Sequence, residues 1–137
     1  MEEIVNKVKQ SGLIQIDLES LRPTGERVFF DIAPQLYMGL ALREKDFRTF
    51  IQEHDWSHYT GKHVAVACTT DAIIPTWAYM LIGSQLSGKA ATLIYGNLAD
   101  LEKHLFDQVI QQMDLTEFED GKIVIKGCSK EAVPLDA

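Results

Sequence analysis

The chain has 137 residues, the usual length of one domain, with the 46% hydrophobic and 24% charged residues of a globular protein. Its formal net charge is −7, from 20 acidic and 13 basic residues, and the basic residues form no stripe. This acidic balance argues against nucleic-acid binding, because a negative surface repels a phosphate backbone.

The N-terminus and the cysteines indicate the compartment. The first residues, MEEIVNKVKQ, are charged and lack the apolar segment of a signal peptide. Cys68 and Cys128 lie far apart and do not form the dense disulfide pattern of a small secreted domain. The longest uncharged stretch, residues 72–88, contains too many polar residues for a membrane span. We therefore expect a cytoplasmic protein with no membrane contact.

Three elements are predicted in the first half of the chain. Residues 13–18 (LIQIDL) alternate apolar and polar side chains, as a half-buried strand does. Residues 26–32 (ERVFFDI) are rich in β-branched and aromatic residues and predict a second strand, which we expect to pair antiparallel with the first. Residues 34–55 have a mostly helical pattern, clearest from residue 43 onward.

Strands and helices alternate from residue 63 onward. We expect Asp71 to cap the first of these helices and Pro75 to lie in its first turn. The alternation predicts parallel strands joined by right-handed crossovers. Residues 1–137 should therefore form a single α/β domain with a five-stranded mixed sheet, parallel in its C-terminal half, and flanking helices. The predicted order is strand 63–68, helix 72–87, strand 91–96, helix 97–113 and strand 122–127.

Cys68 and Cys128 are predicted at the same end of this sheet. Each lies at or just past the carboxyl end of a predicted strand, which is where ligands bind in open α/β sheets. The N-terminus of the helix 72–87 would face the same end and favour the thiolate of Cys68. Two interpretations stay open, since free cysteines are also among the residues that most often fill a core.

The segment HDWSH, residues 54–58, superficially resembles the HExxH motif of zinc peptidases. That motif needs a glutamate and two histidines on one face of a continuous helix, whereas here the acid is aspartate and the helix is ending. We instead expect His54 in the last helical turn, where it suits the helix dipole, and Trp56 as an anchor in the core. His63 and His104 are expected to face solvent.

The helix predicted over residues 72–87 carries no charge and has no clean polar face. A helix that is apolar all round is buried on all sides. Two explanations stay open: a homodimer interface, or central burial under the other helices of the same domain.

Six segments carry a family resemblance: EEIVNKV, GERVFFDI, MGLALREKDFR, HDWSHY, DAIIPTWAYML and KGCSKEAVP, in this order. Together they resemble a bacterial family called domain of unknown function 2480, over essentially the whole chain. The resemblance implies no established activity. It does imply a further helix and another cysteine-containing segment beyond residue 137, so that this chain is either a short form or an incomplete sequence. It also implies genes that lie near iron–sulfur assembly genes.

Three functions follow as alternatives. The first is a metal-binding or iron–sulfur assembly accessory protein, in which Cys68, Cys128 and His54 would hold zinc, iron or an iron–sulfur cluster and iron–sulfur assembly proteins would be partners. The second is a non-catalytic homodimeric scaffold or interaction module, joined through residues 72–87. The third is an enzyme with Cys68 as nucleophile and Asp71 orienting a substrate or water, which is less favoured because the sequence identifies no general base. Further residues that would line a site are Asp55, Trp56, Asp71 and Trp77.

Overall fold

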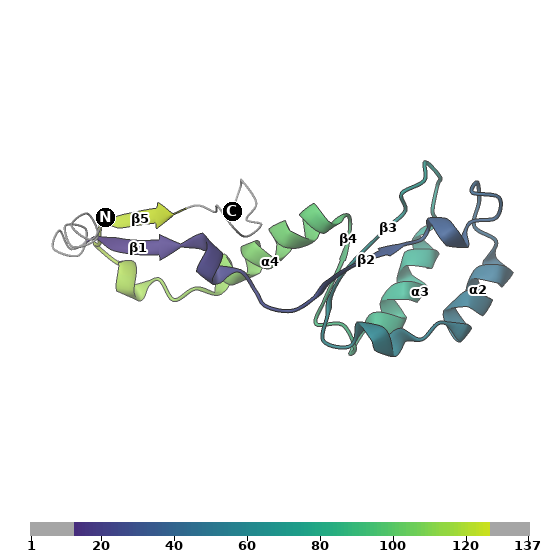
Figure 1. The fold of residues 1–137 in the computed structure, drawn as a ribbon, viewed down its shortest axis with the longest axis horizontal. Helices are drawn as coiled ribbons and strands as arrows, with labels where there is room; N and C mark the ends of the chain where they lie inside the picture. The colour runs from purple at the N-terminus through teal and green to yellow at the C-terminus, as the bar shows by residue number, and fades with distance from the viewer. Residues whose placement is uncertain (1–12, 127–137) are drawn as a thin grey trace. The chain divides into compact units, whose positions relative to one another are not determined.

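The computed structural model describes residues 13–126, which form five strands and three α-helices (Figure 1). None of these helices has the length and apolar character that a membrane span requires. The strands are β1 (Ile14–Asp17), β2 (Arg27–Asp31), β3 (His63–Ala67), β4 (Thr92–Tyr95) and β5 (Ile123–Lys126), and the helices are α2 (Glu44–Glu53), α3 (Thr76–Leu86) and α4 (Leu98–Gln112). Short 3-10 helices cover Leu18–Leu21, Ala33–Gln35, Trp56–Tyr59 and Thr116–Phe118.

The strands form two parallel sheets. β1 pairs with β5, with Ile14 opposite Ile123, and the other three strands lie in the order β2-β3-β4. The predicted α/β class is therefore confirmed, but the single five-stranded mixed sheet is wrong. The predicted antiparallel pairing of the first two strands is also wrong, because their connection contains a 3-10 helix and a turn rather than a tight hairpin.

The chain divides into two compact units. Unit 1 contains the described parts of Met1–Pro23 and Glu102–Ala137, and unit 2 is the continuous segment Thr24–Leu101. The sheet of β1 and β5 belongs to unit 1, and the sheet of β2, β3 and β4 belongs to unit 2. Helix α4 begins in unit 2 and continues into unit 1.

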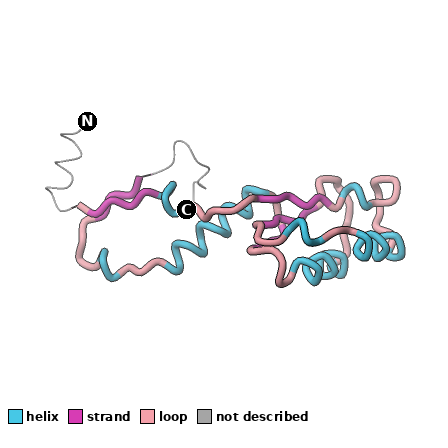
Figure 2. Tube along the Cα trace, turned by 60° about the horizontal axis from the view of Figure 1, so that its bottom comes forward, coloured by secondary structure: helices cyan, strands magenta, loops and turns pink. Residues whose placement is uncertain are grey.

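Unit 2 is a three-stranded sheet with two helices on one face. The strand order follows the chain order, so the crossovers through α2 and α3 advance in the same direction. Right-handed crossovers that advance in one direction place their helices on the same face. Helices α2 and α3 are accordingly in contact with each other, and they lie side by side in Figure 1. Figure 2 shows the same alternation of strand and helix along the chain.

The core of unit 2 lies between this sheet face and the two helices. Val64 and Val66 alternate along β3 and are fully buried toward the helices. Helix α3 contributes Ala78, Ile82 and Leu86, which share one face because they are four residues apart. The rest of this cluster is Phe30, Ile32, Phe47, Ile51, Trp56 and Tyr59.

Helix α3 is shorter than predicted. It begins at Thr76, and Pro75 is its N-cap residue in an extended conformation with φ −62° and ψ 146°. Asp71 is exposed in the preceding loop and does not cap the helix, so that prediction is wrong. Only Thr76, Met80 and Ser84 form an exposed stripe along α3. Most of its apolar surface is therefore covered within unit 2.

The segment 34–55 is only partly helical. Its residues before α2 include a turn in which Tyr37 and Ala41 form an isolated antiparallel bridge. Gly39 has a φ of 70° within this turn, a conformation that glycine adopts without strain. The left-handed turn interrupts the helical pattern, and the helix starts at Glu44, so the prediction holds for its C-terminal part alone.

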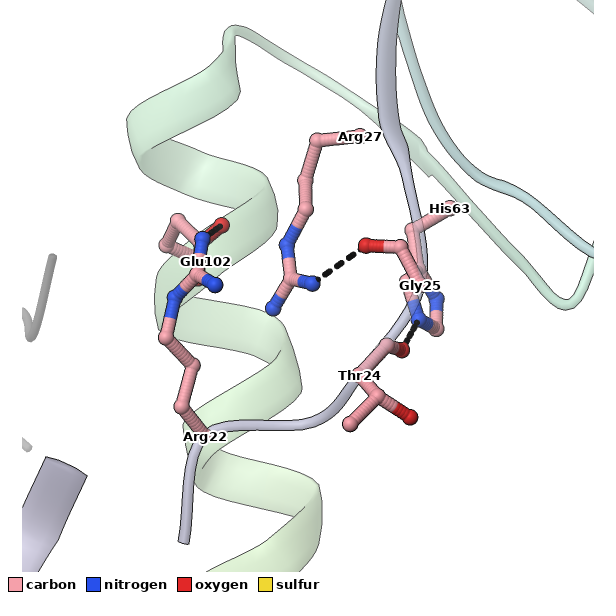
Figure 3. A network of polar contacts seen from close by, with 6 residues as sticks. All are labelled: Arg22, Thr24, Gly25, Arg27, His63 and Glu102. Atoms are coloured by element: carbon pink, nitrogen blue, oxygen red, sulfur yellow. Dashed lines mark hydrogen bonds and ion pairs between the residues drawn. The ribbon is translucent and has the colours of Figure 1, made fainter. Parts of the chain in front are cut away.

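Unit 1 combines the parallel pair β1–β5 with the later turns of α4. An ion pair of 3.3 Å joins Arg22 to Glu102 of α4 (Figure 3). An apolar pocket of about 220 Å³ lies in this unit, lined by Ile16, Leu18, Leu21, Ile110, Met113, Leu115 and Ile125.

Candidate functional site

Asp31 organises the carboxyl end of the three-stranded sheet. One of its carboxylate oxygens accepts hydrogen bonds from the backbone N–H groups of Ala33 and Thr69, at 2.9 and 3.0 Å, and the other accepts from the Thr69 hydroxyl at 2.7 Å. Burial raises the pKa of Asp31, but these hydrogen bonds together outweigh it and hold the pKa below its usual value. Asp31 therefore ties the loop after β2 to the loop after β3, a role that the sequence pattern did not indicate.

Cys68 lies where the sequence predicts it, directly after β3. It is half-buried and packs against the core of unit 2. The nearby Tyr79 of α3 has a raised pKa, mainly because of burial and secondarily because of the charge that Cys68 would carry. Cys128 lies outside the described residues, so the predicted proximity of the two thiols is untested.

Asp71 lies in the loop before α3, and Trp77 lies in the first turn of this helix. Asp71 is exposed in the loop between β3 and α3. The ring of Trp77 packs edge-on against Phe47 of α2, with 5.9 Å between the ring centroids, and the guanidinium of Arg48 lies 5.8 Å from its centre. Trp77 thus connects the two helices.

His54 belongs to an aromatic cluster at the end of α2. Its Nε2 atom shares a hydrogen bond of 2.7 Å with the Tyr59 hydroxyl, and its ring centroid lies 4.9 Å from that of Phe50 and 4.8 Å from that of Trp56. Burial, and then the charge of His58, lower the pKa of His54, while Asp55 raises it. These contacts place His54 among the aromatic side chains at the end of α2.

The remainder of the HDWSH segment has a structural role. Asp55 caps the 3-10 helix Trp56–Tyr59 by accepting from the backbone N–H of Ser57 at 3.1 Å, and it pairs with His58 at 3.4 Å. The indole of Trp56, only 5% exposed, donates to the Ile51 carbonyl at 2.8 Å. The prediction that Trp56 anchors the loop in the core is confirmed. The two histidines do not share a continuous helix, as a zinc-peptidase motif requires.

Metal ligands are not gathered in the described part of the chain. Between residues 13 and 126 the structure holds no group of three or more His, Cys, Asp or Glu side chains that could bind a metal ion. Because Cys128 is outside this range, the ligand set of Cys68, Cys128 and His54 stays a prediction.

Carboxylates are present at two helix N-termini at the carboxyl end of the sheet. Asn97 and Asp100 form reciprocal hydrogen bonds of 2.9 and 2.8 Å between side chain and backbone at the start of α4. Helix α2 has Glu44 and Asp46 in its first turn. These negative charges disfavour phosphate at both positions, in agreement with the missing glycine-rich phosphate motifs.

His63 lies at the opposite, amino end of the sheet and is buried, so its predicted solvent exposure is wrong. Its Nε2–H donates to the Thr24 carbonyl at 2.8 Å, as Figure 3 shows, and its Nδ1 contacts the Thr92 hydroxyl at 2.9 Å. The pairing with Thr92 of β4 could not be read from the sequence, because it depends on the strand order. His63 holds β3 to its neighbours.

A groove runs between α3 and the outer edge of β4, and we call it the α3/β4 groove. Its volume is about 500 Å³, and none of its lining residues is charged. Tyr95 is 54% exposed and Met80 is 66% exposed. The Tyr95 hydroxyl donates to the Tyr79 carbonyl at 3.2 Å, which holds its ring across Gly83. The lining residues are Met80, Gly83, Ser84, Leu86, Ser87, Gly88, Ala90, Ala91, Thr92, Leu93 and Tyr95.

The sequence pointed to only one wall of this groove. An interface was one of two explanations for the uncharged helix, the other being burial within the domain, and β4 was not expected to lie beside it. The free edge of β4 follows from the order β2-β3-β4, in which no other described strand pairs with it.

Comparison with known proteins agrees with the resemblance carried by the six segments. No curated protein and no solved structure matches the chain. A family model described as "Protein of unknown function (DUF2480)" matches residues 2–137, essentially the whole chain. The chain therefore belongs to the DUF2480 family.

Proposed function

We propose that the protein is a non-catalytic interaction module that binds a protein partner through the α3/β4 groove. The observation that carries this proposal is an uncharged groove beside a strand edge that no other described strand covers. Exposed apolar side chains that gather around a hollow are typical of protein-binding surfaces.

The two outer strands of the three-stranded sheet differ in a way that favours β4. Strand β2 carries Arg27 at its first position and Asp31 at its last, and charges of this kind protect a strand edge from pairing. Strand β4 reads TLIY and contains no charge, proline or glycine. The edge that is left unprotected is therefore the one beside the groove.

The carboxyl end of the sheet supports a binding role over a catalytic one. Asp31 is held by three donors, and Asn97 and Asp100 satisfy each other. Tyr79, near Cys68, has a raised pKa and stays protonated at neutral pH, so it cannot serve as the base that a cysteine nucleophile needs.

The proposal can be tested by placing a photo-crosslinking amino acid at position 80 and irradiating the cells that express the protein. Met80 projects from α3 at the groove, and Leu40, which is 74% exposed in the loop after β2, is the matched control position. We expect covalent adducts from position 80 and few from position 40. Mass spectrometry then identifies the attached chain.

The added variant Ser84→Arg sharpens this experiment. Ser84 lies one helical turn from Met80 on the exposed stripe, so a large charged side chain there should block the groove and abolish the adducts from position 80. Adducts that are equally abundant from positions 40 and 80, or that persist with Ser84→Arg, would contradict the proposal.

A metal-binding or iron–sulfur accessory role is the second candidate. The observation that favours it is the half-buried thiol of Cys68 at the carboxyl end of the three-stranded sheet. Cys128 and His54 would be its further ligands, and the metal content of anaerobically purified protein tests this role.

A further inference from the structure

We propose that the occupant of the α3/β4 groove is a second copy of this chain, and that the two copies join their β4 strands antiparallel into one continuous six-stranded sheet. This inference rests on the proposed function, since it names the partner of the same surface. Four features of unit 2 carry it: the free edge, the side-chain alternation, the exposed stripe of α3 and the flanking charges.

The free edge of β4 provides the backbone groups for pairing. The inner edge of β4 is bonded to β3 in the register His63 to Thr92, and its outer edge pairs with no strand of residues 13–126. An outer edge without charges presents N–H and C=O groups to any strand that approaches it. The β-branched and aromatic side chains of TLIY favour an extended partner.

The side chains of β4 alternate in a way that suits a two-fold axis perpendicular to the sheet. Leu93 and Tyr95 face the helices, and Thr92 and Ile94 face the other side. An antiparallel pairing centred on Leu93 or Ile94 keeps these faces matched between the copies. When the pairing is centred on Ile94, Tyr95 of one copy lies opposite Leu93 of the other, so that two apolar side chains on the same face are close enough to touch.

Helix α3 provides the remaining contact area. Four residues of strand pairing fall well short of the roughly 1,200 Å² that a stable interface buries. The axis would also bring together the two α3 stripes, formed by Thr76, Met80 and Ser84. Ser84 is small enough for close approach, and Met80 has the flexible side chain that fills irregular gaps.

The charges that flank β4 distinguish a second copy from other strands. Lys89 is exposed shortly before the strand, and Asp100 is exposed shortly after it. Antiparallel pairing moves the basic flank of each copy toward the acidic flank of the other, whereas parallel pairing would bring like charges together. At a net charge of −7, two copies repel each other over most of their surface, and the uncharged edge is a place where they can meet.

Sedimentation of the full chain over a concentration series tests the dimer. We expect a monomer–dimer equilibrium that Met80→Glu weakens by about 10-fold or more, equivalent to at least about 1.4 kcal/mol. Leu40→Glu makes the same change at a similarly exposed apolar residue outside the groove and should leave the equilibrium unchanged. Circular dichroism confirms that both variants stay folded.

Two further measurements locate the interface. In wild-type protein, amide hydrogen exchange of Thr92–Tyr95 should slow as the concentration rises through the equilibrium. In a Cys68→Ser, Cys128→Ser background, Leu93→Cys or Ile94→Cys should form a disulfide-linked dimer on oxidation. Directly opposite residues of antiparallel strands have Cα atoms about 4.5–5.5 Å apart, which a disulfide can span.

The outcomes separate this inference from the proposed function. A wild-type monomer at all concentrations would overturn the dimer, while adducts between position 80 and a different protein would leave the interaction module intact. A dimer that resists Met80→Glu and gives no crosslink at residues 93 or 94 would place the interface elsewhere and also overturn the inference. Absence of both the dimer and all adducts from position 80 would overturn both proposals.

Discussion

Gly25 lies directly against the imidazole of His63, so that a Cβ atom at residue 25 would come within 2.9 Å of Nε2. Gly25 also has a φ of 114°, a conformation that other residues rarely adopt. The absence of a side chain at Gly25 and its backbone conformation together leave room for the His63 ring to donate its hydrogen bond to the Thr24 carbonyl (Figure 3).

Gly25→Ala should therefore destabilise the protein by about 2–4 kcal/mol, from backbone strain and displacement of the His63 ring. Gly88→Ala is the matched control, because Gly88 has a φ of 78° but a Cβ atom added there would meet no atom within 4 Å. The unfolding free energies of both variants in urea separate the cost of backbone strain from the cost of the contact with His63. Equal losses of unfolding free energy would show that the contact with His63 is unimportant.

The pH dependence of stability should report on His54. Its pKa is lowered in the folded protein, so the unfolded chain binds more protons once the pH falls below the ordinary value of 6.5. The stabilisation is therefore present above that pH and declines as the pH falls from about 6.5 toward the lower folded-state pKa. His54→Gln should flatten the unfolding free energy between about pH 7 and 5.5.

His104→Gln is the control for this pH dependence, because it removes a histidine on α4 that is not part of the aromatic cluster. We expect its pH profile to match that of the wild type in the same window. A profile of His54→Gln that keeps the full wild-type slope would show that another group is responsible.

The Trp56 indole should contribute to stability through its hydrogen bond as well as its ring. Trp56→Phe keeps an aromatic ring beside Phe30, whose centroid lies 5.6 Å away, but leaves the buried Ile51 carbonyl without its donor. We expect a loss of about 1–3 kcal/mol in thermal or urea unfolding. A loss below about 0.5 kcal/mol would mean that the carbonyl finds another donor.

Asp31→Asn should destabilise the carboxyl end of the sheet at neutral pH by about 1–3 kcal/mol, because a charged acceptor of three hydrogen bonds is replaced. The pKa of Asp31 is lowered on folding, so its stabilisation is present above about pH 4 and is lost as the pH falls through the folded-state value. The difference in unfolding free energy between Asp31→Asn and the wild type should disappear in acid. Thr69→Val, which removes one hydroxyl donor, should cost less stability than Asp31→Asn at neutral pH. A gap that is independent of pH would indicate a purely steric effect.

Metal analysis of anaerobically purified protein tests the accessory role. If Cys68 and Cys128 are ligands, either serine variant should lose the bound zinc or iron, and His54→Gln should lower the content further. The matched variant His104→Gln should keep the metal content of the wild type. A wild-type protein that stays colourless and metal-free after reconstitution with iron and sulfide, and after exposure to zinc, would remove this candidate.

Local elements were predictable from the sequence because their signals lie within each segment. The strands predicted over residues 63–68 and 91–96 are observed as His63–Ala67 and Thr92–Tyr95, since short β-branched runs bounded by turns specify strands. The helix predicted over 97–113 is observed as Leu98–Gln112, where Asn97 supplies the cap.

Strand partners were not predictable, because pairing is decided by contacts between distant segments. Nothing in residues 13–18 indicates that Ile14 will face Ile123 rather than a residue of the next strand. The same limit applies to the candidate site. The position of Cys68 follows from a single strand end, whereas the groove requires Tyr95 and Gly83 to meet across two elements.

The pairing of β1 with β5 has a consequence for synthesis of the chain. Every residue of unit 2 lies between the two segments that form unit 1, so the ribosome releases a continuous, self-contained unit before β1 has met its partner. About a hundred more residues must be synthesised after Ile14 before its pairing partner Ile123 is available. Closing such a distant parallel pair is slow compared with local folding. Among the described strands, β1 should consequently be one of the last two to pair, and until then it stays exposed to solvent and to chaperones.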